Sequence, residues 1–331
     1  MPPAPMLNVT TVERDMRSPL STPLPASTIQ VGGQAVPEGV MMRAPGVWGI
    51  AIRTPDGSIV SESQPVTSLK EQHPAAGWPF VRGAVALGES MVVGVKAIKL
   101  ALYYSTGNEK RQGDTVSRVQ IGGAIVAALA MVVLLFKVVP LLIASTLPVG
   151  SGYGFLFTEG GIRVGMFVAY LAGVSALPHL QRLYQYHSAE HKTIHCYEKG
   201  LPLTPANVQA QSRIHPRCGT AFLLWVMVVA IFVYALVGHP ALWVMVISRV
   251  VLLPVIAGVT YELIRLAARY ERFRVVRAVM APGLALQFLT TRPCELDQCE
   301  VAIVSLETAL AAAEQGVFVA ADRLGDLPAA A

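Results

Sequence analysis

Four long apolar segments constrain the fold of this chain more than any other feature of its sequence. Each is close to the ~20 residues that a helix needs to cross a hydrocarbon core about 30 Å thick. The composition agrees, because 53% of the residues are hydrophobic and only 14% are charged, against about 25% charged in an ordinary soluble domain. The sequence therefore predicts a mainly α-helical, multi-pass protein of the cell membrane, whose partner is the lipid bilayer. The segments run over residues 119–139, 162–178, 220–238 and 241–260.

The distribution of lysine and arginine predicts how these helices are oriented, because short basic loops are retained in the cytoplasm. Of the 26 basic residues, 11 precede the first segment, 5 lie between the second and third, and 7 follow the fourth. The connections at 140–161 and 238–240 contain none. Both termini and the loop over 179–218 are therefore expected in the cytoplasm. The net charge of +5 follows from this topology, and no nucleic-acid partner is expected.

The parts of the chain outside the apolar segments divide into smaller regions. Residues 1–28 are rich in Pro, Ser and Thr and are predicted to be a disordered tail. Residues 29–118 are predicted to form a cytoplasmic β-containing region, with a turn at "TPDG" and an interfacial amphipathic helix over 79–105. The transmembrane region covers 119–262, and 263–331 forms a cytoplasmic tail of amphipathic helices. The expected fold is a polytopic helical membrane protein of about four spans with a small N-terminal α+β region.

The stretch "YHSAEHKTIHCYEKG" concentrates three histidines, two glutamates and a cysteine directly after the second apolar segment. If that segment continues as a helix through this stretch, His187 and His191 lie one turn apart on one face, which is how two imidazoles bind one divalent ion. Glu190 lies beside them. His-x-x-Glu-His is the inverted form of the zinc-protease motif, in which the glutamate is the general base. His191 and His195 form a second pair of the same spacing, and the sequence does not exclude it.

Three further side chains are candidates to complete a metal site. His215 and Cys218 lie in "HPRCGT", just before the third apolar segment, and Glu262 follows the fourth. All three are expected at the cytoplasmic membrane boundary, at the same depth as the histidine helix. Zinc accepts histidine, cysteine and glutamate ligands, so this set favours a zinc site. The alternatives are a helix cap and a small buried thiol for His215 and Cys218, and an interfacial partner of Arg265 or Arg269 for Glu262.

Three charged residues lie outside this set and are candidates for a role with substrate. Arg249 falls near the middle of the fourth apolar segment, where a charge usually faces a partner or a water-filled cavity. No acidic residue lies in the core of another predicted span, so its partner is not identified. Glu38 and Arg43 belong to "GGQAVPEGVMMR", which is either a glycine-rich turn that opens a strand or a lid that folds over the histidine site.

Six motifs occur in a fixed order along the chain: "GGQAVPEGVMMR", "RGAVALGES", "HSAEHKTIHCYE", "HPRCGTAFLL", "YELIRLAAR" and "LTTRPCELDQCEVAI". Together they resemble the YqhQ-like membrane proteins over about residues 31–308. That family has no established function and is often described as predicted metal-dependent enzymes, so the resemblance implies a metal-dependent enzyme. The chain departs from the family pattern at Pro37, Ser188, Cys294 and Cys299, and none of these departures removes a candidate ligand.

Two hypotheses for the function follow from these residues. In the first, the protein is a metal-dependent hydrolase at the cytoplasmic membrane face, with zinc held by His187, His191 and one of the three further candidates, and with Glu190 as the base. Its substrate would be an amide or ester reached from the cytoplasm or the inner leaflet. In the second, the protein is a non-catalytic scaffold or assembly factor whose metal pins helix ends together. An open coordination position favours the enzyme, and four protein ligands favour the scaffold.

Overall fold

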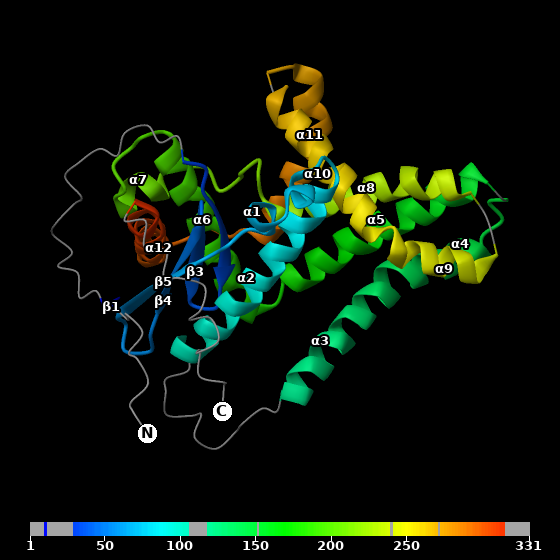
Figure 1. Cartoon of the computed structure of the whole chain (residues 1–331). Coiled ribbons are helices and arrows are strands. Elements are labelled where there is room, and N and C mark those ends of the chain that lie inside the picture. The colour runs from blue at the N-terminus through cyan, green and yellow to red at the C-terminus, as the bar shows by residue number, and fades with distance from the viewer. Residues whose placement is uncertain are drawn as a thin grey trace.

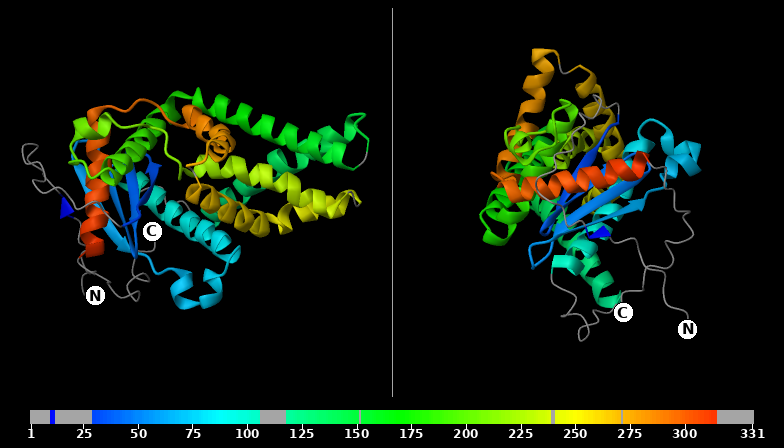
Figure 2. Two further views of the ribbon diagram at one scale, coloured as in Figure 1. Left: turned by 90° about the horizontal axis from the view of Figure 1, so that it is seen from above. Right: turned by 90° about the vertical axis from the view of Figure 1, so that its left-hand side faces the viewer.

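The structure, a computed structural model, describes residues 10–11, 29–105, 118–150, 152–238, 241–270 and 272–314 (Figure 1). Of the predicted disordered tail over 1–28, only Thr10 and Thr11 fall within these residues. The chain is mainly helical, with one small sheet near its N-terminus. The sheet and the helices packed on it form one end of the molecule, and the apolar helices extend from it (Figures 1 and 2).

The sheet is antiparallel, and its strand order places β2 at an edge. The strands pair in the order β1 (Thr10–Thr11), β5 (Ile59–Pro65), β4 (Val47–Arg53), β3 (Gly39–Ala44) and β2 (Gly32–Val36). The turn predicted at "TPDG" joins β4 to β5. Pro37 and Glu38 form the tight turn between β2 and β3, and Glu38 has the positive φ, 54°, that such two-residue hairpin turns use. This hairpin carries the "GGQAVPEGVMMR" motif.

Helices cover both faces of the sheet (Figure 2). The helix predicted over 79–105 forms as α2 (Val81–Ser105), and it packs on the face that carries Trp48 and Ile50. The opposite face packs against α6 (Pro178–Glu198) and α12 (Leu296–Glu314). A Cβ added at Gly49 of β4 would lie 2.7 Å from the backbone nitrogen of Ala309, so α12 rests directly on the sheet. The helix that the sequence analysis placed in a C-terminal tail thus belongs to the same packed unit as the N-terminal sheet.

Short helices connect these parts. They are α1 (Leu69–Gln72) and the 3-10 helix η1 (Pro74–Gly77) between the sheet and α2, and α7 (Pro205–Gln209) after α6. The remaining helices are α3 (Arg118–Val133), the π-helix η3 (Leu134–Val138), α4 (Val139–Thr146), α5 (Tyr153–Ser175), α8 (Gly219–Val237), α9 (Leu242–Val251), α10 (Leu253–Arg269) and α11 (Arg274–Thr290).

Three helical segments of the described chain are long and apolar enough to cross a membrane, namely Val126–Thr146, Tyr153–Ser175 and Gly219–Val237. The fourth predicted segment, 241–260, is not one continuous helix. It breaks at Leu252, and Pro254 follows in the first turn of α10. Proline has no backbone N–H and clashes with the preceding turn, so it starts helices well and continues them poorly. The expectation of four continuous spans is therefore not confirmed.

Proline also separates the second span from the histidine helix. The sequence analysis treated these as one continuous helix, but α5 ends at Ser175 and α6 begins at Pro178. Leu177 has an extended backbone, with ψ 122°, which is the conformation that the residue before proline prefers. The histidines thus lie on a separate helix whose direction the apolar span does not fix.

The start of α5 at Tyr153, and not near Ile162, identifies the partner of Arg249. Glu159 lies in α5 with 1% of its surface exposed, and it accepts hydrogen bonds from Nε and Nη2 of Arg249 at 3.1 and 2.6 Å. Arg163, one turn further along α5, donates to the same carboxylate. No acidic residue was expected in the core of another predicted span, because the second span was predicted to begin at residue 162. The helix begins earlier and includes Glu159, so this expectation is wrong. Arg249 is therefore held in a buried ion pair with Glu159.

Candidate metal centre

Helix α6 presents different side chains to its two sides. Tyr186, Ala189 and Ile194 are buried in the core that α6 shares with the sheet and α12. The helix ends with Gly200 just beyond it, at φ 64°, the left-handed conformation that commonly closes a helix. The histidines lie on the side that faces the start of α8 and the end of α11, as the contacts below show.

His187, His191 and Cys218 form one group, which we call the first ligand group. One ligand atom from each residue lies within 4.8 Å of the others. Cys218 is the N-cap residue of α8, and its Sγ is 3.4 Å from Nε2 of His187. The imidazole rings of His187 and His191 lie 4.4 Å apart between centroids. Two imidazoles and one thiol from two helices are thus close enough to bind one divalent ion.

Backbone carbonyl groups fix the orientation of both imidazoles. Nδ1 of His187 lies 2.8 Å from the carbonyl oxygen of Thr290, and Nδ1 of His191 lies 2.6 Å from that of Arg213. A carbonyl oxygen only accepts, so each Nδ1 carries a proton, which leaves Nε2 as the ring nitrogen available to a metal ion. Metal-binding histidines almost always donate their other ring N–H in this way. The three ligand side chains, and the two carbonyl groups that orient the imidazoles, therefore fit zinc, which accepts two imidazoles and a thiolate.

Glu190 lies against the first ligand group and against strand β2. Its Oε2 is 3.9 Å from Nε2 of His187, and only 4% of its surface is exposed. Burial raises the pKa of the Glu190 carboxyl to about 7, although the neighbouring His187 acts in the opposite direction. A Cβ added at Gly33 would lie 2.7 Å from Cγ of Glu190 and 2.9 Å from its Oε1. The glycine thus lets the strand backbone approach the carboxylate directly.

Gly33→Ala is expected to destabilise the protein, while Gly32→Ala should have little effect. The added methyl group at position 33 can be accommodated only if Glu190 or the strand moves, and such overpacking typically costs about 1–3 kcal/mol. At position 32 nothing lies within 4 Å of the added carbon, so this variant is a matched control in the same strand. Thermal unfolding of both variants in detergent checks this. Equal midpoints would contradict the close approach.

A second group of potential ligands consists of His195, Glu198 and His215, again with one atom from each within 4.8 Å of the others. Oε2 of Glu198 lies 3.6 Å from Nε2 of His215, and Glu198 also pairs with Arg217. The rings of His191 and His215 lie 5.6 Å apart between centroids, so the two groups adjoin. His191 therefore belongs with His187, and His195 belongs with His215.

His215 is a neutral imidazole on a firmly held backbone. Burial, together with the nearby His195, His191 and Arg217, lowers its pKa to about 3. The side-chain amide of Gln287 holds its backbone on both sides, with Oε1 accepting from the His215 N–H and Nε2 donating to the His215 carbonyl, each at 2.8 Å. No sequence pattern indicated a role for Gln287, Thr290 or the Arg213 carbonyl, because their positions depend on how α11 and the loop before α8 pack.

Glu262, the remaining predicted ligand, is not brought to the histidines. Its carboxylate accepts from Nε and Nη2 of Arg82 on α2 at 2.7 and 2.6 Å. It also accepts from the backbone N–H of Phe80 at 3.4 Å. The partner is thus Arg82, and not Arg265 or Arg269. Glu262 ties α10 to the beginning of α2.

The residues predicted to act as a lid or clamp are held in ion pairs of their own. Both carboxylate oxygens of Glu38 accept from Arg182 at 2.5 Å, and the Tyr186 hydroxyl lies 3.4 Å from one of them. Arg43 pairs with Glu89 on α2 at 3.0 Å. Glu38 therefore secures the β2–β3 turn to α6 at Arg182 and Tyr186, and Arg43 secures β3 to α2. Neither side chain is in the first ligand group.

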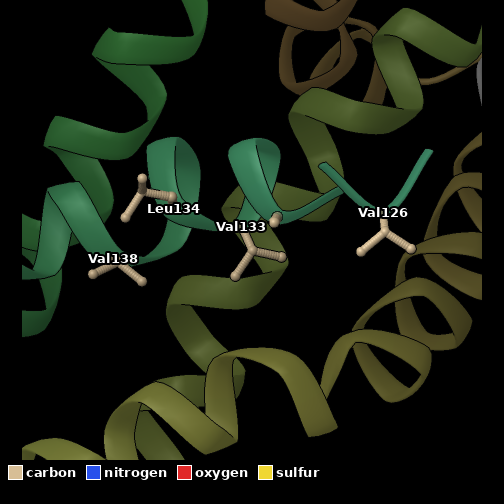
Figure 3. A pocket seen from close by; sticks show the side chains of 5 residues that line it. Val126, Val133, Leu134 and Val138 are labelled. Atoms are coloured by element: carbon tan, nitrogen blue, oxygen red, sulfur yellow. The ribbon is translucent and has the colours of Figure 1, made fainter. Parts of the chain in front are cut away.

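An apolar groove of about 480 Å³ lies on α3 and η3 (Figure 3). It is lined only by aliphatic side chains and offers no group for catalysis. These are Val126, Ala130, Val133, Leu134 and Val138, all on the first candidate span. The groove is therefore a feature of the membrane-facing part, and the candidate site remains on α6.

Comparison with known proteins supports the family suggested by the motifs. Residues 78–312 match the family described as "Protein of unknown function (DUF1385)". The chain is 35% identical over 291 residues to "Uncharacterized protein YqhQ" of Bacillus subtilis (strain 168). This alignment covers 84% of the present chain and 92% of the Bacillus protein. No solved structure shows a significant match. The resemblance to the YqhQ-like proteins is thus confirmed, and the chain belongs to this family of proteins of unknown function, DUF1385.

Proposed function

We propose that the protein is a metal-dependent hydrolase that acts at the cytoplasmic face of the cell membrane. The observation that carries the proposal is the first ligand group, His187, His191 and Cys218, with the buried carboxylate of Glu190 beside it. Catalytic zinc sites use three protein ligands and keep one position open, whereas structural sites close with four. A group of three ligands next to a candidate base has the composition of a catalytic site.

The chemistry divides between the ion and the chain. A zinc ion bound here would act as a Lewis acid and lower the pKa of a bound water toward about 7. Glu190 lies 3.9 Å from the ligand nitrogen of His187, so its carboxylate can accept a proton at the site and return it to the leaving group. The Thr290 and Arg213 carbonyls hold the two imidazoles in the tautomer that this arrangement requires. The substrate class is an amide or an ester.

A structural metal in a scaffold protein is the alternative, and one observation favours it. His215 adjoins His191, and its buried Nε2 has no hydrogen-bond partner among the described residues. A shift of this ring toward the first ligand group would supply a fourth ligand and close the site. The number of protein ligands therefore separates the two functions.

Metal analysis and cobalt substitution test the proposal. The detergent-purified protein should hold one zinc ion per chain, and the cobalt-substituted protein should show the absorption of a thiolate-bound tetrahedral ion. Added azide should shift the ligand-field bands, because an open position exchanges its water. A spectrum that azide does not change, and that changes in His215→Ala, would support the closed structural site and contradict the hydrolase.

The proposed site requires that α6 and both termini lie on the cytoplasmic side of the membrane. It also requires that α9 and α10 together return the chain across the bilayer. A membrane-impermeant maleimide applied to intact cells should label Pro148→Cys, in the loop between α4 and α5, and should miss Ala206→Cys on α7. The native cysteines are all buried, which keeps the background low. Ala206→Cys should react once the cells are lysed. The reverse pattern would invert the topology.

A further inference from the structure

The free edge of β2 lies beside the candidate site. In an antiparallel pair, successive residues point their N–H and C=O groups alternately toward the partner strand and away from it. Val36 and Gly39 close the β2–β3 hairpin, so the groups of Gly33 and Ala35 point away from β3. Within the described part of the chain, no hydrogen bond reaches the outward backbone groups of these two residues.

Strand β2 lacks three of the features by which proteins usually protect an exposed strand. Sheet edges are commonly blocked by proline, by charged side chains or by bulges. The β2 sequence is "GGQAV", without charge or proline, and its pairing with β3 has no bulge. Gly32 and Gly33 are exposed. The edge therefore offers bare backbone donors and acceptors to another extended chain.

The same edge is adjacent to the candidate base. The Cβ position of Gly33 lies 2.9 Å from Oε1 of Glu190. A strand added to β2 would run about 4.8 Å from it in the plane of the sheet, and Glu190 lies over the face of the sheet at Gly33. Beyond the start of β2, Nη2 of Arg217 lies 3.4 Å from the carbonyl oxygen of Val31, which joins the edge to the loop that carries Cys218.

We infer that the substrate is a polypeptide in extended conformation, which adds as a strand to the free edge of β2 and is cleaved at a peptide bond beside Glu190. This inference rests on the proposed function and names its substrate class. The outward N–H and C=O groups of Gly33 and Ala35 are two residues apart, which is the spacing that an extended peptide backbone pairs with in strand addition. Water adds to the peptide carbonyl carbon, and the C–N bond breaks. Glu190 passes the proton to the leaving nitrogen, and the products are a carboxylic acid and an amine.

Ala35→Pro tests the pairing, with Ala35→Ser as the matched control. Proline removes one outward N–H from an edge strand without removing a hydrogen bond to β3. The zinc-loaded full-length protein is given a synthetic mixture of unstructured, end-blocked dodecapeptides and, separately, p-nitrophenyl acetate. The ratio of peptide cleavage to ester hydrolysis should fall about tenfold in Ala35→Pro, the effect of one lost hydrogen bond, and should stay near the wild-type ratio in Ala35→Ser, which keeps the N–H. Wild-type peptide cleavage by a folded Ala35→Pro variant would overturn the inference.

A second measurement does not depend on any variant folding. A cleaved peptide is resynthesised in two forms, N-methylated at alternate residues in one register or in the other. The form that is methylated at the N–H groups facing β2 should not be cleaved by the wild-type protein. The form that is methylated at the other N–H groups should be cleaved. Equal cleavage of both forms, or ester hydrolysis without peptide cleavage, would overturn the inference and leave the hydrolase standing. Hydrolysis of neither substrate by the zinc-loaded protein would overturn the proposed function, and the inference with it.

Discussion

His187→Ala and His191→Ala are each expected to reduce bound zinc from one ion per chain to almost none. Each variant removes one of only three protein ligands of the first ligand group. Loss of a mere supporting partner of a ligand already costs about 10- to 100-fold in metal affinity, so loss of a ligand should cost more. Metal content after dialysis against a weak chelator, measured by atomic emission, gives the result.

His179→Ala is the matched control, because it lies on the same helix and is exposed. This variant should keep its zinc. Unfolding must be excluded in the two ligand variants, so their circular dichroism and detergent elution profiles are compared with the wild type. Stoichiometric zinc in both His187→Ala and His191→Ala would rule out the first ligand group as the metal site.

Glu190→Gln is expected to keep its zinc and lose hydrolysis by about 100- to 10,000-fold, the contribution that a positioned general base typically makes. Glutamine keeps the size of the side chain and its place against Gly33, but it cannot accept the proton. Because burial opposes the charge of Glu190, the uncharged amide should leave thermal stability near that of the wild type or raise it. Rates with p-nitrophenyl acetate and with a cleaved dodecapeptide report the loss.

Glu71→Gln serves as the control for the same chemical change, since Glu71 is exposed on α1. It should retain wild-type rates. A Glu190→Gln protein that hydrolyses both substrates as fast as the wild type would exclude Glu190 as the base. If His187→Ala also failed to fold, a structural metal would be the better account.

The sequence predicted the features that neighbouring residues determine. His187 and His191 are four residues apart, so any helix through them brings their side chains to one face. Cys218 lies beside His187, because it ends the loop that leads from α6 to α8. The "TPDG" turn depends on four residues, and the apolar spans depend on local hydropathy. Each of these predictions needed only local spacing.

What could not be predicted depends on contacts between distant segments. Thr290 supports His187 across 103 positions of the chain, and it does so through a backbone carbonyl, which has no sequence signature. Glu262 was predicted as a metal ligand, with Arg265 or Arg269 as alternative partners, whereas its carboxylate accepts from Arg82, 180 positions away in the chain. Gly33 could have been noted from the paired glycines of its motif, but the carboxylate that requires it lies on another helix.

The buried pair of Glu159 and Arg249 sets a condition on how the chain enters the membrane during its synthesis. Translocon measurements put the cost of one charged side chain at the centre of a helix at about 2.5–3.5 kcal/mol. Glu159 is made 90 residues before Arg249, and until then Arg163 is its only partner among the described contacts. The short helix α9 carries Arg249, whose charge is neutralised by Glu159. The carboxylate partner of Arg249 lies on α5, so the burial of this arginine depends on the packing of α9 against α5, a helix made 90 residues earlier.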